Sequence, residues 1–300
     1  MIRVGLVGAG PWARMFHAPM LANGPGLRLS AVWARRREAA EQLARQYHAA
    51  VAERYEDLLG GCDAVAFTVP PDVQAVMATA AARAGKHLLL EKPLAFSVAD
   101  AEAIAVAADA AGVATQLVLT YRFTTPVREF LRSLVGAPVR HLRLAWIGGG
   151  ALAGSPFATP WRQAAGAVLL DLGPHTLDLA EAAAGTVTEL QAAQSGGVVT
   201  ITTSHSGGAI GHVALSATTP GAAGRLEADA VTDTGRFVLA DPSAVLQGDV
   251  QRAIADQFAR AVRGESAQEI DVHRGVQLQR LLDAVAESIR TGLPAIPRAG

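Results

Sequence analysis

The sequence has little cysteine, no net charge to speak of and no long apolar run. Cys62 is the only cysteine in 300 residues, which excludes an intramolecular disulfide. The net charge of −1 gives no electrostatic footprint for nucleic acid or a membrane surface. No stretch of about 18 apolar residues exists, and residues 1–7 are too short for a signal peptide. We therefore expect a cytoplasmic protein without nucleic-acid or membrane partners.

The composition that remains is typical of a folded chain. Hydrophobic residues make up 50% of the sequence and charged residues 18%, which supports a sizeable core and argues against disorder. A length of 300 residues allows one large domain or two ordinary ones.

Strands and helices alternate in the first part of the chain. The expected strands cover residues 2–8, 27–33, 63–69, 86–91 and 113–119, and the expected helices 12–23, 37–46, 72–84 and 98–111. This alternation predicts a parallel sheet with helices on both faces. We assign residues 1–119 to a Rossmann dinucleotide-binding domain.

The pattern changes near residue 120, and strands joined by Gly- and Thr-rich turns then dominate. We expect strands at 140–147, 187–194, 198–204, 211–217, 226–231 and 237–239, and helices at 174–184, 250–263 and 273–291. Short connections between consecutive strands predict an open, largely antiparallel sheet. Residues 120–300 are thus expected to form an α+β domain for substrate binding and oligomerisation, and the whole chain is an α/β protein.

A glycine-rich turn follows the first expected strand. Gly8 allows the tight turn, Gly10 lets a pyrophosphate approach the backbone, and the small Ala13 permits close helix packing. Pro11 and Trp12 open the helix, whose N-terminal N–H groups face the phosphates. The alternative is a plain tight turn, but its place in a strand–turn–helix–strand unit favours nucleotide binding.

The end of the second expected strand carries basic residues. An NAD site places an acid there for the ribose hydroxyl, whereas this chain has Ala34 followed by Arg35, Arg36 and Arg37. Arginine matches a 2′-phosphate bidentately, so NADP(H) is favoured and NAD(H) remains possible. The alternative is a solvated basic helix start, which the helix dipole mildly disfavours.

Two longer motifs resemble the glucose–fructose oxidoreductase/inositol dehydrogenase (Gfo/Idh/MocA) superfamily. The first reads AGKHLLLEKPLA over residues 84–95, and the second GAVLLDLGPHTLD over residues 166–178. The tail, residues 283–292, is similar to the family as well. Ala13, Ala34 and Gln74 depart from the usual residues at their positions; the first two bear on cofactor choice.

The resemblance implies hydride transfer between a nicotinamide and the carbonyl or carbinol carbon of a sugar, polyol or similar small molecule. His175 would be the general acid/base, Lys92 would stabilise charge on the substrate oxygen, and Asp171 would orient the substrate or His175. Lys92 would also hold the nicotinamide ribose. The cofactor site would further include residues that end or follow later strands: Val69, Pro70, Gln74 and Glu91. The expected strands between residues 187 and 217 are rich in Thr, Val and Ala and carry few charges, so we expect one face of their sheet to pack on helices and the other to be an apolar patch of the kind that marks an interface. The family further implies a homodimer or homotetramer formed through the C-terminal sheet.

The spacing of the second motif puts Asp171, His175 and Asp178 on one face if the segment is helical. We expect Pro174 at the first helical position, which would place His175 in the first turn and lower its pKa. The alternatives are that Asp171 is a helix cap and Asp178 a first-turn acid. Nothing else supports a metal site.

Further substrate-binding candidates, by resemblance, are Tyr121, Arg122, Trp161, Arg162 and Asp178. Interdomain packing is an equally good reading of the four aromatic and arginine positions. His17, His48, His87, His141 and His273 have no partner that spacing can name. Two other functions stay open: a non-catalytic NADP(H)-binding sensor or subunit, and a redox-neutral glycosidase that recycles its NAD.

Overall fold

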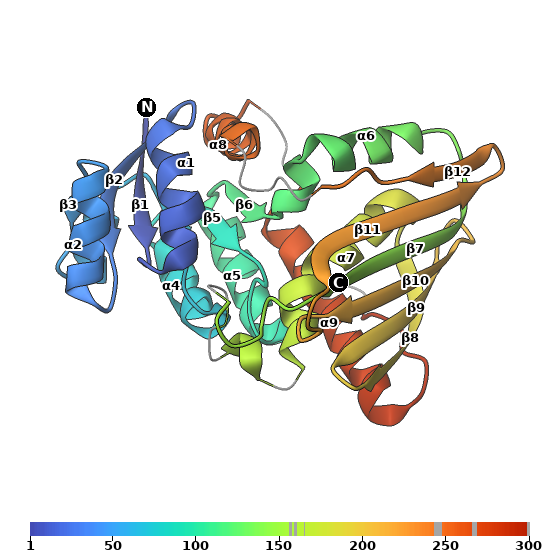
Figure 1. Ribbon diagram of the computed structural model, residues 1–300. Coiled ribbons are helices and arrows are strands. Elements are labelled where there is room, and N and C mark those ends of the chain that lie inside the picture. Colours follow the sequence, from blue (N-terminus) through green and yellow to red (C-terminus); the bar gives the residue numbers. More distant parts are fainter. Residues whose placement is uncertain (156–157, 159–160, 165, 243–247, 266–268, 299–300) are drawn as a thin grey trace. The chain divides into compact units, whose positions relative to one another are not determined.

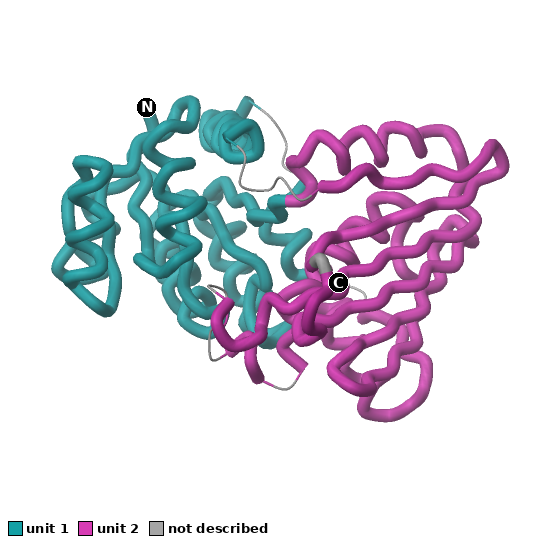
Figure 2. The backbone as a smooth tube through the Cα atoms, viewed as in Figure 1, with its two compact units in different colours: residues 1–120, 246–276 teal, residues 121–245, 277–300 magenta. Residues whose placement is uncertain are grey.

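The computed structural model describes residues 1–298 apart from 156–157, 159–160, 165, 243–247 and 266–268. It divides into two compact units, residues 1–120 with 246–276 and residues 121–245 with 277–300 (Figure 2). The expected division at residue 120 placed 246–276 in the second domain. In the structure, α8 (Gly248–Val262) packs against α1 (Ala18–Asn23), and the Gln251 carboxamide donates to the Phe16 carbonyl at 3.0 Å. The assignment of substrate binding to the second domain stays a prediction.

The first unit contains the expected parallel sheet. Its strand order is β3-β2-β1-β4-β5-β6, which is the Rossmann order with the switch point between β1 and β4 (Figure 1). The strands are β1 (Ile2–Val7), β2 (Leu27–Trp33), β3 (Ala50–Val51), β4 (Ala64–Phe67), β5 (His87–Glu91) and β6 (Thr115–Val118), and the further helices are α2 (Arg37–Gln46), α3 (Tyr55–Gly60), α4 (Pro71–Arg83) and α5 (Val98–Ala111).

The sequence did not indicate three features of this unit. β3 and α3 are too short to give a periodic signal, so they were not predicted. The first helix is not uniform either: Ala13–His17 forms a π-helical turn before α1, and the Ala18 N–H bonds to the Ala13 carbonyl across five residues. Such turns often occur at functional sites.

The second unit is built on a mixed, mostly antiparallel sheet of order β12-β11-β7-β10-β9-β8, which confirms the expected architecture. Among the described strands of this sheet, β10 and β7 are the one pair that runs in parallel. The strands are β7 (Val139–Gly148), β8 (Val187–Ser195), β9 (Val198–His205), β10 (Ile210–Ser216), β11 (Ala223–Thr232) and β12 (Gly235–Val238), and the helices are α6 (Thr125–Ser133), α7 (Ala167–Ala184) and α9 (Val272–Thr291), whose first residues belong to the first unit. Short 3₁₀ turns cover Thr120–Phe123 and Trp161–Gln163.

The expected start of α7 is wrong. The helix begins at Ala167, so Pro174 lies in its interior and His175 sits eight residues from the start. A proline inside a helix costs about 3 kcal/mol, and burial of Leu169, Leu172 and Leu177 on the same helix offsets that cost. Because dipole effects fade within the first turn, the expected lowering of the His175 pKa by the helix start loses its basis.

The two faces of the second sheet differ in chemistry. α7 packs against β7, β9 and β10, and Ser288 of α9 accepts a hydrogen bond from the Ala192 amide of β8 at 2.9 Å. We expected the other face of β8–β10 to be apolar, and this was wrong. Its exposed positions include Gln191, Thr200, Thr202 and His212, because polar residues alternate with the buried apolar ones.

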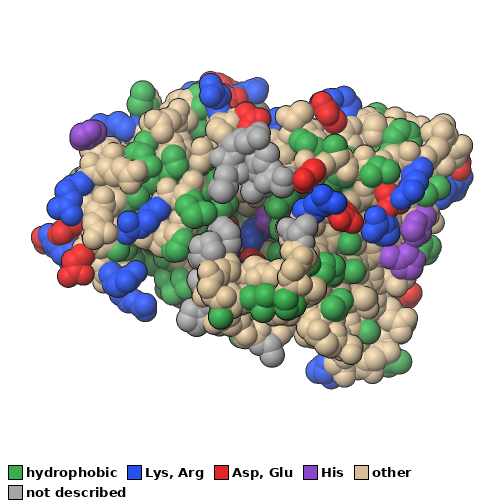
Figure 3. Space-filling model, viewed as in Figure 1, with side chains coloured by type: hydrophobic (Ala, Val, Ile, Leu, Met, Phe, Trp, Pro, Cys, Tyr) green, Lys and Arg blue, Asp and Glu red, His purple; other side chains and the backbone are tan. Residues whose placement is uncertain are grey.

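The surface carries charges of both signs. On the face drawn in Figure 3, basic and acidic side chains are interspersed over both units. Among the described residues, no helix is long and apolar enough to cross a membrane.

Candidate functional site

The carboxyl ends of the parallel strands meet at one edge of the first sheet. The glycine turn follows β1, Ala34 to Arg36 follow β2, Val69 and Pro70 follow β4, and Lys92 follows β5. Ligands of open α/β sheets bind at this edge, where the strand order reverses. The fold therefore brings the predicted cofactor-binding segments together.

The glycine turn fits a dinucleotide. Gly8 has a φ of 109°, and a Cβ there would lie 2.7 Å from the Thr68 carbonyl oxygen. A Cβ at Gly10 would meet no atom of the chain within 4 Å, which leaves space against the backbone. Ala13 is fully buried, as close helix packing requires. The turn thus has the tight bend and the open approach that a pyrophosphate needs.

The three arginines after β2 are not equivalent. Arg37 pairs with Glu41 at 2.9 Å and with Glu53 at 3.3 Å. Arg35 and Arg36 are exposed, and their side chains make no hydrogen bond or ion pair with any described residue. The guanidinium groups of Arg35 and Arg36, which follow β2 at the carboxyl edge of the sheet, are therefore available to an anion, whereas that of Arg37 is held by two glutamates.

Gln74 holds the backbone around Lys92. Its side chain is buried, its amide donates to the carbonyls of Glu91 at 2.8 Å and Leu94 at 2.9 Å, and its carbonyl accepts from the Glu91 amide at 2.9 Å. We expected Gln74 in the cofactor site. The structure assigns its polar atoms to positioning the segment that carries Lys92.

The Glu91 carboxylate collects three hydrogen bonds. Oε1 accepts from the Trp12 indole at 2.7 Å and from His17 Nε2 at 2.8 Å, and Oε2 accepts from the Lys92 amide at 3.2 Å. His17 was among the histidines without a nameable partner. Its partner lies 74 residues away in sequence, and no local spacing could have found it.

His175 lies in an aromatic environment in the second unit. Its ring centroid is 5.2 Å from that of Tyr121 and 5.8 Å from that of Trp146, and these two rings meet edge to face at 4.7 Å. Trp146, on β7, was missed because a strand tryptophan is normally a packing residue. Burial raises the pKa of the Tyr121 phenol well above its ordinary value, so the hydroxyl stays protonated.

The remaining candidates of the second unit form two ion pairs. Arg162 Nε lies 3.1 Å from Asp171 Oδ1, and its guanidinium stacks over the Trp161 ring at 4.7 Å. Arg122 bonds to Asp178 at 2.9 Å, and Asp178 is fully buried. Asp178 therefore positions Arg122, while Asp171 and Arg162 are both partly exposed on the His175 side of α7.

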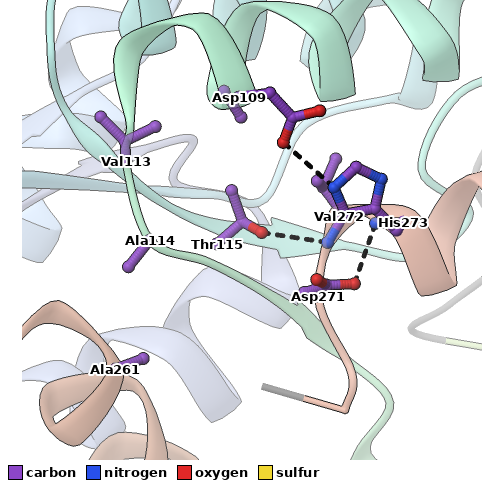
Figure 4. Close-up of a pocket in the computed structure, with 9 residues that line it drawn as sticks. Asp109, Val113, Ala114, Thr115, Ala261, Asp271, Val272 and His273 are labelled. Carbon is purple, nitrogen blue, oxygen red and sulfur yellow. Dashed lines mark hydrogen bonds and ion pairs between the residues drawn. The ribbon is translucent and has the colours of Figure 1, made fainter. Parts of the chain in front are cut away.

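A cavity of about 210 Å³ lies elsewhere in the first unit (Figure 4). Its lining includes Thr115, Asp271 and His273, and His273 pairs with Asp109 at 3.0 Å. Thr115 begins β6, so the cavity lies at the amino end of the sheet, opposite the edge of the glycine turn. Among the described residues, no group of three or more His, Cys, Asp or Glu is placed to hold a metal ion.

Comparison with known proteins assigns the first part of the chain to a family. Residues 2–118 match the model of an oxidoreductase family with an NAD-binding Rossmann fold. They belong to the Gfo/Idh/MocA oxidoreductase family. The resemblance is thereby confirmed for residues 2–118, which contain the first of the two sequence motifs, and a nicotinamide dinucleotide is the family's cofactor.

One relative by sequence and two solved structures are similar to this chain. The chain is 31% identical to "Dehydrogenase FPY6" of Fusarium mangiferae over 58% of its own length and 56% of the relative's, so the alignment spans about half of that protein. The fold is similar to that of GenD2 from gentamicin A biosynthesis, solved with NAD (TM-score 0.88, 21% identity, 99% and 97% of the two chains covered). Levoglucosan dehydrogenase, solved with NADH, is also similar (TM-score 0.86, 18% identity, both chains fully covered).

Proposed function

We propose that this protein is an NADP(H)-dependent oxidoreductase acting on the carbonyl or carbinol carbon of a sugar, polyol or similar small molecule. The observation that carries the proposal is the edge of the first sheet, where an open glycine turn and the Lys92 segment are joined through Glu91. When bound, a nicotinamide dinucleotide supplies the hydride donor or acceptor.

Three side chains share the work on the substrate. The Lys92 ammonium donates a hydrogen bond to the substrate oxygen and stabilises the negative charge that develops there. An imidazole nitrogen of His175 gives or takes the proton of that oxygen. Asp171, paired with Arg162, orients the substrate or His175. Tyr121 stays neutral and acts as a wall of the site and not as a base.

The proposed preference for NADP(H) rests on Arg35 and Arg36. Both guanidinium groups are exposed and unpaired among the described residues, and Ala34 takes the place of the acid that would bind a ribose hydroxyl. The two structural neighbours named above were solved with NAD or NADH, at 18–21% identity. Such distant relatives share the fold, while the residues after β2 set the choice of phosphate.

We also propose a homo-oligomer formed through the outward face of β8–β10. That face exposes Thr200, Thr202, Gln191 and His212, and it carries few charges. Uncharged polar residues on an open sheet permit close contact with a second copy because few charges have to be desolvated.

Net consumption of NADPH tests the proposed reaction. Ketosugars, inosones and small α-dicarbonyls are screened by the loss of NADPH absorbance, with NADH in parallel. The chain has two lysines, so Lys86→Met is a matched control for Lys92→Met: the Lys86 ammonium bonds to the Cys62 carbonyl at 3.0 Å, away from the cofactor edge.

We expect steady turnover in the wild type and in Lys86→Met, and almost none in Lys92→Met. Tight NADPH binding with no turnover on any substrate favours a non-catalytic sensor. Turnover of a glycoside without net NADPH loss favours the redox-neutral glycosidase.

A further inference from the structure

The Glu91 carboxylate lies where the cofactor turn meets the Lys92 segment. The residue Glu91 is 8% exposed, and its carboxylate accepts hydrogen bonds from Trp12, His17 and the Lys92 backbone. The indole and the amide can only donate, so the Glu91 oxygens accept both hydrogen bonds. A buried carboxylate with three donors is held firmly in one orientation, because charge-assisted hydrogen bonds are the strongest in proteins.

His17 is the least expected member of this group. Its ring is fully buried, and its Nδ1 has no hydrogen-bond partner among the described residues. A buried N–H without an acceptor is costly, so the ring hydrogen is placed on Nε2, where Glu91 accepts it. Nε2 of His17 therefore donates to Glu91 and helps to orient its carboxylate, and it is the one ring nitrogen of His17 with a hydrogen-bond partner among the described residues.

The π-helical turn explains how two side chains reach the same oxygen. Trp12 and His17 are five residues apart, and in an α-helix they would point about 140° away from each other. The turn Ala13–His17 instead closes its hydrogen bond over five residues, which brings positions i and i+5 to one side. The Trp12 ring also stacks on Phe16 at 4.7 Å. The π-helical turn thus allows Trp12 and His17 to donate hydrogen bonds to the same Glu91 oxygen.

We propose that His17 is a positioning residue that acts through Glu91 on both the cofactor turn and the Lys92 backbone. Without the His17 donor, Trp12 is the one described residue that still donates to Glu91 Oε1, and the carboxylate gains freedom to rotate away from the Lys92 amide. The turn and the lysine segment then lose their common anchor. The inference rests on the proposed dinucleotide site.

Dinucleotide binding tests this role without relying on turnover. NADPH affinity is measured by fluorescence titration, and unfolding temperature in parallel, for His17→Leu, His17→Gln and Glu91→Gln. His87→Gln is the matched control, because its Nδ1 accepts from the Ala114 amide at 2.9 Å at the amino end of β5, far along the strand from Glu91.

We expect His17→Leu and Glu91→Gln each to bind NADPH about tenfold more weakly. His17→Gln should recover most of the affinity, because its carboxamide can still donate to Glu91. His87→Gln should lower the unfolding temperature and leave the affinity unchanged. Wild-type affinity in His17→Leu overturns the inference, as does a His17→Gln variant no better than His17→Leu. A wild type that binds no dinucleotide instead overturns the proposed function.

Discussion

Replacing Arg35 with alanine is expected to remove most of the preference for NADPH over NADH. A 2′-phosphate near an exposed guanidinium gains about 1 kcal/mol per unit charge at 4 Å in water, and the phosphate is a near-dianion. Salt screens part of this attraction, so a net value of about 1.4 kcal/mol, or tenfold in Kd, is expected. The structure supports the estimate because neither Arg35 nor Arg36 has to give up a described partner in order to bind.

The matched control is Arg37→Ala. It removes the same charge from the same segment, but Arg37 is already bound to Glu41 and Glu53. Fluorescence titrations with NADPH and NADH at low and high salt give the four dissociation constants needed for each protein. Arg35→Ala should weaken NADPH about tenfold and leave NADH nearly unchanged, whereas Arg37→Ala should change the ratio little. Equal affinities of the wild type for NADPH and NADH would refute the reasoning.

Three other outcomes follow from the same structure. His175→Ala should lower kcat by about 10²–10⁴-fold and Lys92→Met by about 10²–10³-fold, while the Kd for NADPH rises only a few-fold in each. The double variant should have a kcat little below that of the less active single variant, because residues that act together are not additive. Near-wild-type turnover in His175→Ala would exclude His175 as the acid/base. Asp63 receives a hydrogen bond from Arg3 that lowers its pKa to about 2, so the native state binds fewer protons than the unfolded state between that value and the usual pKa of about 4. Asp63→Asn should therefore lower the free energy of unfolding by less than about 1 kcal/mol at pH 7, since the Arg3 and Asp63 side chains are both more than a third exposed. In denaturant titrations, the difference in unfolding free energy from wild type should shrink as the pH falls from 4 to 2. A difference that stays constant over this range would contradict this assignment. Light scattering should find an oligomer of the 31.0 kDa chain, and Thr202→Arg, which places a charge on the outward sheet face, should dissociate it; a wild-type monomer at micromolar concentration would rule out the assembly.

Much of the fold could be predicted because its signals are local. Strand β1, the glycine turn and the helices with glycine ends all follow from short patterns in the sequence. The start of α7 could not, because Pro174 suits a first helical position far better than an interior one, so the local preference pointed to a start that the structure does not have. Only burial of the residues before it decides between the two, and burial is a property of the tertiary structure.

The site divides in the same way. Arg35, Lys92 and His175 were predicted from motifs whose residue types and spacing indicate the chemistry. His17 and Trp146 were not, because each contacts a partner distant in sequence: Glu91 for the first and the His175 ring for the second. Likewise, the sequence motif that contains Asp178 could not predict that Asp178 is buried and paired with Arg122.

Transfer of deuterium from labelled NADPH tests the central claim most directly. The wild type is incubated with NADPH carrying deuterium at the reactive nicotinamide carbon and with the best carbonyl substrate from the screen. We predict one deuterium per product molecule, bound to the former carbonyl carbon, and no labelled product from Lys92→Met. Unlabelled product, or turnover without loss of label from NADPH, would contradict an oxidoreductase that transfers hydride to its substrate.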